Sequence, residues 1–324
     1  MIRATPIRRW LLALALSGVC GPAVAQAYPA KPIRFVVGYA AGGVADITAR
    51  MIAQKLSIAL GQQVVVDNRP GAGGIVAAEA VAKADPDGYT LLHLNQGNAV
   101  SAALFKTLPY DTIRDFAPIS AMGYFDVLVL ANKGSPLNSI RDVLAQARTN
   151  PDKLNIGTVS VGSGQHMAAA LFKAKSGLNL TLVPFKSTPN LLAALKGNDI
   201  QVAFEITAPA RALIQSGDLK VLAVTSAKRF SGLPEVPTVM ESGLADYQVS
   251  AWNGVAAPAR TPQAIIDRLN KEINAAMAQP DVKEKFLEFG IEARGGTPDE
   301  LRDLLAGEIA KWKAVVSSTG MERL

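Results

Sequence analysis

Gly38-Tyr39-Ala40-Ala41-Gly42-Gly43 and Val161-Gly162-Ser163-Gly164 are the two stretches that decide the fold. Each follows a short apolar run typical of a strand and precedes a segment of helical period. Glycine lets the backbone turn sharply and come close to a ligand, and a helix start presents unpaired amides that favour an anion. Two such junctions predict two lobes facing each other across a cleft. Each junction is equally compatible with a plain strand-to-helix turn.

The rest of the chain alternates in the same way. Short β-branched runs are followed by helical segments, which predicts β/α units with parallel strands. The expected strands are residues 33–39, 63–67, 90–94, 127–131, 155–158, 182–185, 200–204, 221–225 and 254–257. After Ala257 we expect helices alone. Two of these helices are expected to begin with a capping motif. Thr261-Pro262 places a capping hydroxyl before a proline, and Thr297-Pro298-Asp299-Glu300 is a capping box.

The N-terminus predicts export. Arg3, Arg8 and Arg9 precede an apolar core at Trp10 to Val19, and small residues follow, so we expect a signal peptide at residues 1–27, cleaved near Ala25 or Ala27. The core is shorter than the ~20 residues that cross a membrane. The only cysteine, Cys20, falls within this leader and has no small residue directly before it, so lipidation is not expected.

Size and charge narrow the class of protein. A chain of 324 residues with 49% hydrophobic residues exceeds what a single core comfortably supports, which favours two lobes. Its formal net charge of +6 is spread without long runs of one sign, so no nucleic-acid partner is expected. Nothing in the composition indicates an obligate oligomer, and we expect a monomer.

Catalytic and metal-binding patterns are absent from the sequence. Neither glycine junction is followed by the Lys-Ser/Thr pair of a phosphate loop, and Ser163 lacks the flanking glycines of a nucleophile elbow. His93 is expected to be a buried or capping imidazole. His166, at a helix start, is compatible with either a ligand contact or a local contact to its loop. We therefore expect a binding protein with no enzymatic activity, no metal and no cofactor.

Several ordered motifs closely resemble the Bug family, the substrate-binding receptors of tripartite tricarboxylate transporters. They are Gly42-Gly43-Val44-Ala45-Asp46, Asp67-Asn68-Arg69-Pro70-Gly71-Ala72-Gly73-Gly74, Pro86-Asp87-Gly88-Tyr89-Thr90, Gly162-Ser163-Gly164-Gln165-His166, Pro184-Phe185-Lys186, Leu222-Ala223-Val224-Thr225, Pro234-Glu235-Val236-Pro237-Thr238 and Trp252. The resemblance covers essentially the whole chain after the leader.

The resemblance implies an α/β fold of the two-lobed type II periplasmic-binding (Venus flytrap) kind, joined by crossing strands. Residues 28–127 with 253–324 would form one lobe, and residues 128–252 the other. It also implies a periplasmic receptor that delivers a small dicarboxylate, tricarboxylate, acidic amino acid or aromatic carboxylate to membrane transporter subunits. The same binding event would serve a receptor for a membrane sensor, and an exported α/β enzyme is a further alternative.

Site residues follow from the resemblance position by position. They are Tyr39, Ala41, Gly42 and Gly43 from the first lobe, Ser163, Gly164, Gln165, His166, Phe185, Ser187 and Thr188 from the second, and Glu205 as a contact to the ligand or a loop fastener. Thr188 precedes Pro189 and is also a candidate helix cap. Asp46 and Asn68-Arg69-Pro70-Gly71 are expected to be structural, although Arg69 remains a candidate for orienting a charged ligand.

The sequence departs from the family pattern where specificity is expected to be set. Val44 and Ala45 stand where a threonine or serine is common. Together with Tyr39 and Phe185 they make the expected pocket partly apolar. This favours a ligand with a hydrocarbon or aromatic body over citrate.

Overall fold

The structure is a computed structural model that describes residues 28–71 and 74–324, so the expected leader lies outside the described residues. The strands are β1 (Ile33–Val37), β2 (Val64–Asn68), β3 (Thr90–Asn95), β4 (Phe116–Asn132), β5 (Asn155–Val159), β6 (Thr181–Phe185), β7 (Val202–Ile206), β8 (Leu219–Val224), β9 (Ser250–Pro258) and β10 (Ile291–Ala293). The helices are α1 (Val44–Leu60), α2 (Ile75–Ala82), α3 (Gln96–Leu104), α4 (Ile140–Thr149), α5 (Gly164–Ser176), α6 (Thr188–Gly197), α7 (Thr207–Gln215), α8 (Gln263–Ala278), α9 (Pro280–Glu288) and α10 (Pro298–Thr319).

Two groups of strands share one long strand. In the first, β1 pairs in parallel with β2 and β3, and β9 runs antiparallel between β3 and β4. In the second, β5 pairs in parallel with β6 and β7, while β7 and β8 run antiparallel to β4. Residues 116–126 of β4 pair with β9, and residues 127–132 pair with β7 and β8. The change of partner in mid-strand is what joins the two halves.

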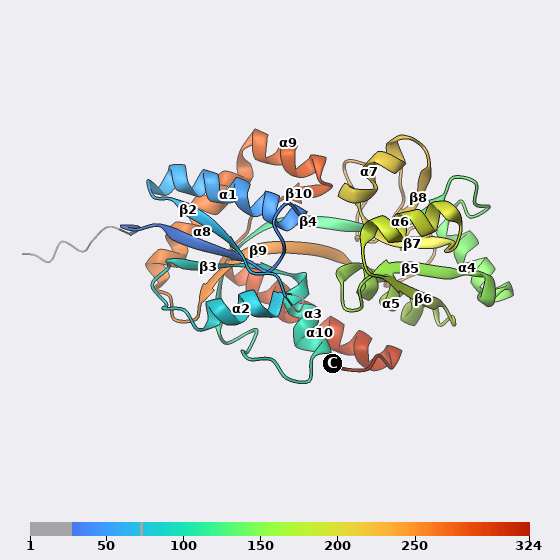
Figure 1. The fold of residues 1–324 in the computed structure, drawn as a ribbon, viewed down its shortest axis with the longest axis horizontal. Coiled ribbons are helices and arrows are strands. Elements are labelled where there is room, and N and C mark those ends of the chain that lie inside the picture. The colour runs from blue at the N-terminus through green and yellow to red at the C-terminus, as the bar shows by residue number, and fades with distance from the viewer. Residues whose placement is uncertain (1–27, 72–73) are drawn as a thin grey trace, which may run out of the picture.

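Figure 1 shows these halves side by side, with β4 and β9 running between them. Helices α1, α8 and α9 cover one face of the first half, where Phe35, Ile52 and Phe286 are fully buried. Helix α10 packs against α3 of the first half and α5 of the second, burying Trp312. Within the described residues, no helix is long and apolar enough to cross a membrane.

The strands differ from expectation in four ways. β4 begins at Phe116, eleven residues before the expected start at Val127, because Pro118 and Gly123 weaken the strand pattern there; the pairing with β9 shifts register beside both residues. β9 is longer than residues 254–257. The short β10 contradicts the expectation of helices alone after Ala257. Finally, the sheet is mixed, because β4 pairs antiparallel with β7, β8, β9 and β10, and β3 pairs antiparallel with β9.

Helix starts were predicted with mixed success. Thr297 and Glu300 form the expected capping box of α10. The cap expected from Thr261 is wrong: its hydroxyl donates to the Pro258 carbonyl oxygen over 2.8 Å, and α8 begins at Gln263 without a side-chain cap. The N-cap is Pro262, which has no side-chain acceptor, so the hydroxyl of Thr261 lies one residue too early to cap the helix.

Three strand-to-helix junctions position the site. β1 leads into α1, β3 leads directly into α3, and β5 leads into α5. β1 and β3 are parallel neighbours, so their carboxyl ends lie at the same edge of the sheet. Ligands of open α/β sheets bind in the crevice beyond such strand ends.

Candidate functional site

A cavity of about 640 Å³ lies where the three junctions meet. This is the usual size of a small-molecule site. The start of α1 contributes Gly43, Val44 and Ala45, that of α3 contributes Asn95, Gln96 and Gly97, and that of α5 contributes Ser163, Gly164 and Gln165. Residues of both expected lobes therefore line one cavity.

The α1 junction presents backbone amides to this cavity. Gly43 is the N-cap, with φ −79° and ψ 169°, and no side chain caps the helix. Among the described residues, the amides of Gly43, Val44 and Ala45 donate no hydrogen bond. They are the unpaired donors expected at a helix start.

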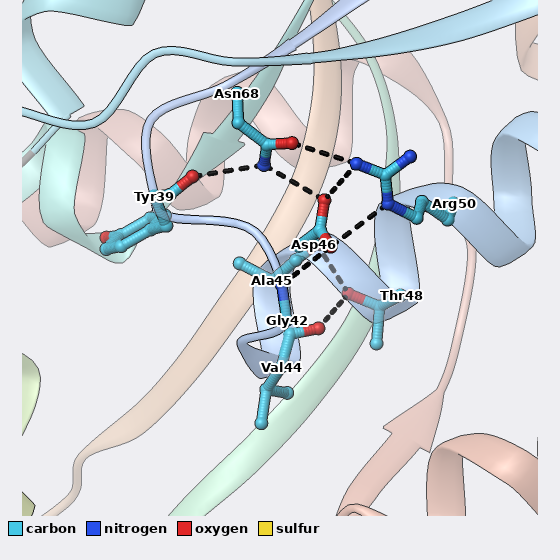
Figure 2. Close-up of polar contacts among 8 residues, drawn as sticks. All are labelled: Tyr39, Gly42, Val44, Ala45, Asp46, Thr48, Arg50 and Asn68. Carbon is cyan, nitrogen blue, oxygen red and sulfur yellow. Dashed lines mark hydrogen bonds and ion pairs between the residues drawn. The ribbon is translucent and has the colours of Figure 1, made fainter.

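A charged network braces this junction from behind (Figure 2). Asp46 is buried, and it accepts hydrogen bonds from the Gly42 amide (2.9 Å), Arg50 Nε (3.0 Å) and Asn68 Nδ2 (2.9 Å). Asn68 Nδ2 also donates to the Tyr39 carbonyl oxygen over 3.1 Å. Burial acts to raise the pKa of Asp46, but the hydrogen bonds from Arg50, Gly42 and Asn68 outweigh it and the pKa is lowered. The expected structural role of Asp46 is confirmed.

The α5 junction is capped by its own serine. The Ser163 hydroxyl donates to the Val159 carbonyl oxygen over 2.6 Å and accepts from the His166 amide over 3.1 Å. The Ser163 amide donates to the Ser160 carbonyl oxygen. Within the described part of the chain, the amides of Gly164 and Gln165 have no acceptor. These two amides, and not the Ser163 hydroxyl, are the free donors.

A buried carboxylate braces the second junction. Glu205 is fully buried on β7 and accepts from Gln165 Nε2 (2.7 Å), Thr188 Oγ1 (2.7 Å) and the Ile206 amide (2.8 Å). Burial raises the pKa of Glu205, although these hydrogen bonds act in the opposite direction. The side chain is thereby engaged in holding the loop.

A third helix start, at α3, was not predicted as part of the site. Asn95 caps α3 in a reciprocal arrangement with Asn98, and the Asn95 side chain accepts from the Gly97 amide over 2.8 Å. The Tyr39 hydroxyl donates to the same Asn95 oxygen over 3.0 Å, which ties the α1 junction to α3. The sequence signal was present: Asn95-Gln96-Gly97-Asn98 directly follows an apolar strand.

The described side chains that line the cavity are uncharged at neutral pH. None of the described side chains that line it is an aspartate, glutamate, lysine or arginine. His93 lines it and is buried, and burial lowers its pKa to about 4, so it is uncharged at neutral pH. An anion here would meet the partial positive charge of three helix N-termini.

The expected site residues divide into two groups. Those that line the cavity are Tyr39, Gly43, Ser163, Gly164 and Gln165. Those outside the lining are Ala41, Gly42, His166, Phe185, Ser187, Thr188 and Glu205. Several members of the second group lie behind the loops and support them. Asn95, Gln96, Val100, Leu104 and Trp252 line the cavity but were not predicted to do so.

Local contacts explain two of the residues outside the lining. His166 Nδ1 lies 3.0 Å from Thr158 Oγ1, and burial lowers the pKa of this imidazole. Thr188 is the first residue of α6 and does not cap it, because the N-cap position is Ser187; the Thr188 hydroxyl donates to Glu205. Arg69 forms an ion pair with Asp67 over 2.9 Å.

The two linked halves and the cavity between three helix starts define an α/β solute-binding protein of the periplasmic-binding-protein class. Solved structures agree. The Rpa4515 protein of R. palustris, solved with adipate, is 33% identical with a TM-score of 0.80 over 92% of this chain and 100% of that one. The periplasmic binding protein BugD is 31% identical with a TM-score of 0.77 over 92% and 100%. MatC from Rhodopseudomonas palustris, solved with bound malate, is 32% identical with a TM-score of 0.75 over 89% and 100%.

Sequence comparisons identify the family. The model of the tripartite tricarboxylate transporter family receptor matches residues 48–321. Protein BugT of Bordetella pertussis is 35% identical over 95% of both chains. A protein from the tcbD–tcbE intergenic region of a Pseudomonas species is 37% identical over 95% of this chain and 93% of its own. The chain belongs to the tripartite tricarboxylate transporter receptor family, as its motifs predicted.

Proposed function

We propose that this protein is a periplasmic receptor that binds the carboxylate of a small metabolite in the cavity between α1, α3 and α5. The observation that carries the proposal is the convergence of three helix starts on one cavity. Among the described residues, no charged side chain lines it, and the amides of Val44, Ala45, Gly164 and Gln165 donate no hydrogen bond. Such amides are fixed by the backbone, so they bind an anion without the cost of ordering a long side chain.

The solved relatives support a carboxylate as the anion. Two structures of similar proteins are described with adipate and with malate. Both molecules are carboxylates, and the family is named for tricarboxylate transport. The amide cradle of this chain suits a carboxylate because both of its oxygens accept hydrogen bonds.

The geometry around Ser163 supports binding without catalysis. A serine nucleophile needs a base within hydrogen-bond reach. Here the Ser163 hydroxyl donates to the Val159 carbonyl oxygen, and the ring of His166 faces Thr158 instead. The captured ligand would therefore leave unchanged.

We further propose the organisation that goes with this role. Residues 28–127 with 253–324 form one lobe and residues 128–252 the other, which is supported by the change of β4 partner after Asp126. The exported chain, cleaved near Ala25 or Ala27, acts as a monomer and hands its ligand to the membrane subunits of a tripartite transporter.

Calorimetry on the chain without residues 1–27 tests the function. The probes are linear carboxylates with one or two acid groups, each paired with its neutral amide. At least one carboxylate should bind, and its amide should bind at least about tenfold more weakly, because hydrogen bonds to a charged group are stronger. Binding should also raise the unfolding temperature, since ligand at 100 times Kd adds about 2.7 kcal/mol of stability. Failure of every carboxylate to bind would refute the proposal.

A further inference from the structure

The cavity continues well beyond the helix starts, along the face of α3. Gln96, Val100 and Leu104 all line it, and they are spaced four residues apart. Side chains at this spacing lie on one face of a helix, and eight residues of α-helix span about 12 Å. A side chain at Gly164 would meet Gln96 Oε1 at 2.6 Å, so a carboxylate against the free amide of Gly164 lies near Gln96, and the rest of the ligand can extend along two turns of α3.

The far end of the cavity is apolar. Leu104, Phe105 and Leu324 line it from one half of the molecule. Val159 and Val161 line it from the other half. The loop at Gly162 lies so close to Leu104 that a side chain at 162 would meet Leu104 Cδ2 at 2.8 Å, so the two halves touch here.

Electrostatics differ between the two ends. The start of α3 carries a partial positive charge and its end a partial negative charge, so an anion is favoured near Gln96 and disfavoured near Leu104. The guanidinium of Arg323, the residue before Leu324, donates to the Phe105 carbonyl oxygen over 2.7 Å. At the start of α3, Gln96 Nε2 donates to the buried carboxylate of Glu308 over 3.4 Å, and the ion pair between this carboxylate and Lys311 offsets its negative charge.

We propose that this cavity selects ligands with one carboxylate and an apolar body, and discriminates against linear dicarboxylates. This inference rests on the proposed function and names its substrate class. One carboxylate occupies the amide cradle, and the hydrocarbon part lies against Val100, Leu104 and Phe105. A second carboxylate at the far end would lose its hydration beside apolar side chains and a helix C-terminus, without a cation to replace it.

The decisive experiment compares hexanoate with adipate, which have the same number of carbons and differ by one acid group. Calorimetry at pH 7.5 should show hexanoate binding at least about tenfold more tightly. Affinity should rise from acetate through butyrate to hexanoate by about fourfold for each buried methylene. Benzoate should also bind, and citrate should not.

Two neighbouring substitutions on α3 test where the hydrocarbon lies. Val100→Thr keeps the shape of a cavity-lining side chain but adds a hydroxyl, and should weaken hexanoate at least about fivefold. Ser101→Val makes the opposite change on the next residue and should strengthen hexanoate binding about fourfold. Acetate, which reaches only the cradle, should bind both variants like the original protein. Circular dichroism melts establish that each variant is folded.

The outcomes separate this inference from the proposed function. If adipate binds as tightly as hexanoate or tighter, the carboxylate function stands and the selectivity is wrong. In that case loss of adipate binding in Arg323→Gln would identify the group that receives the second carboxylate. If hexanoate binds but neither α3 substitution changes its affinity, the hydrocarbon does not lie along α3 and the inference is overturned. If no monocarboxylate or dicarboxylate binds, the proposed function fails and the inference fails with it.

Discussion

The α1 junction and the α5 junction have the same backbone design but different braces. Both run from a parallel strand through a glycine turn into a helix whose first amides are unpaired. Asp46 braces the first with a cation, Arg50, and the charged form of this acid is favoured. Glu205 braces the second with an amide, a hydroxyl and a backbone amide, and burial raises its pKa.

The comparison teaches that a binding surface made of backbone amides depends on carboxylates that never reach the ligand. The sequence-based expectation placed Glu205 and Thr188 among the candidate ligand contacts. Thr188 donates to Glu205, which also accepts from Gln165 and the Ile206 amide. An acid behind a loop and an acid in a pocket look alike in a sequence. Substitutions that change one brace, one amide or one cap at a time can distinguish their roles.

The largest effect is expected from Gly43→Val. A Cβ at this position would meet only the Ala40 carbonyl oxygen, at 3.7 Å, and the backbone is extended, so the variant should fold. The branched side chain would keep a carboxylate from the first amides of α1. Loss of hydrogen bonds to a charged acceptor should weaken binding roughly 10- to 150-fold by calorimetry. Ala41→Val, in the same loop but outside the cavity lining, is the control and should bind normally.

Removing the charge of Asp46 and removing that of Glu205 should change the stability of the protein in opposite directions. Asp46→Asn replaces one acceptor oxygen by a donor that faces Asn68 or Arg50, so stability in denaturant melts at pH 7 should fall by about 1.5–3 kcal/mol. Glu205→Gln keeps an acceptor for Gln165 and Ile206, and its new amide can donate to Thr188. This variant should be as stable as the original protein or more stable at pH 7.

The contributions of Asp46 and Glu205 to stability depend on pH, as the direction of each pKa shift predicts. The pKa of Asp46 is lowered in the folded protein. Its contribution to stability is therefore present above its ordinary pKa of 3.8 and is lost as the pH falls through its pKa in the folded state. The cost of Asp46→Asn should therefore shrink in acid. Because the folded pKa of Glu205 is raised above 4.5, its contribution is lost as the pH rises through the folded value. The relative gain from Glu205→Gln should then grow between pH 4 and 8, and a shrinking gain would contradict this assignment.

A smaller effect is expected from Ser163→Ala. The hydroxyl caps α5 and donates to Val159, so its removal should cost about 0.5–2 kcal/mol of stability. Ligand affinity of the folded variant should change little, because the free donors are the amides of Gly164 and Gln165. A strong loss of affinity with unchanged stability would show that the hydroxyl itself binds the ligand.

The smallest effect is expected from Arg69→Gln. Its guanidinium lies outside the cavity lining and pairs with Asp67 in a partly exposed ion pair, which contributes about 0–1 kcal/mol to stability. Calorimetry should show affinity within about twofold of the original protein, because exposed ion pairs act weakly at a distance. If Arg69→Gln abolished binding while Gly43→Val did not, a side-chain anchor would have to replace the amide cradle.

Local patterns in the sequence were enough to locate two of the three helix starts. Glycine turns, the Thr297–Glu300 capping box and the motif around Asp46 and Asn68 depend on residues close along the chain. The same patterns failed at Thr261, which lies one residue before the N-cap of α8, and at β4, where Pro118 and Gly123 hide a long strand. In β4, pairing with the distant β9 overrode the local preference.

The sequence by itself determined the family, the α/β class and the two glycine junctions that supply free amides. Tertiary structure alone decided that α3 is the third helix start and that Val100 and Leu104 line a cavity. An apolar residue repeated every four positions predicts a buried helix face. Whether that face meets a core or a ligand depends on β3 pairing with β9, which lies far along the chain, and on the second half approaching through β4. No local signal records those long-range contacts, because they arise only when the strands pair.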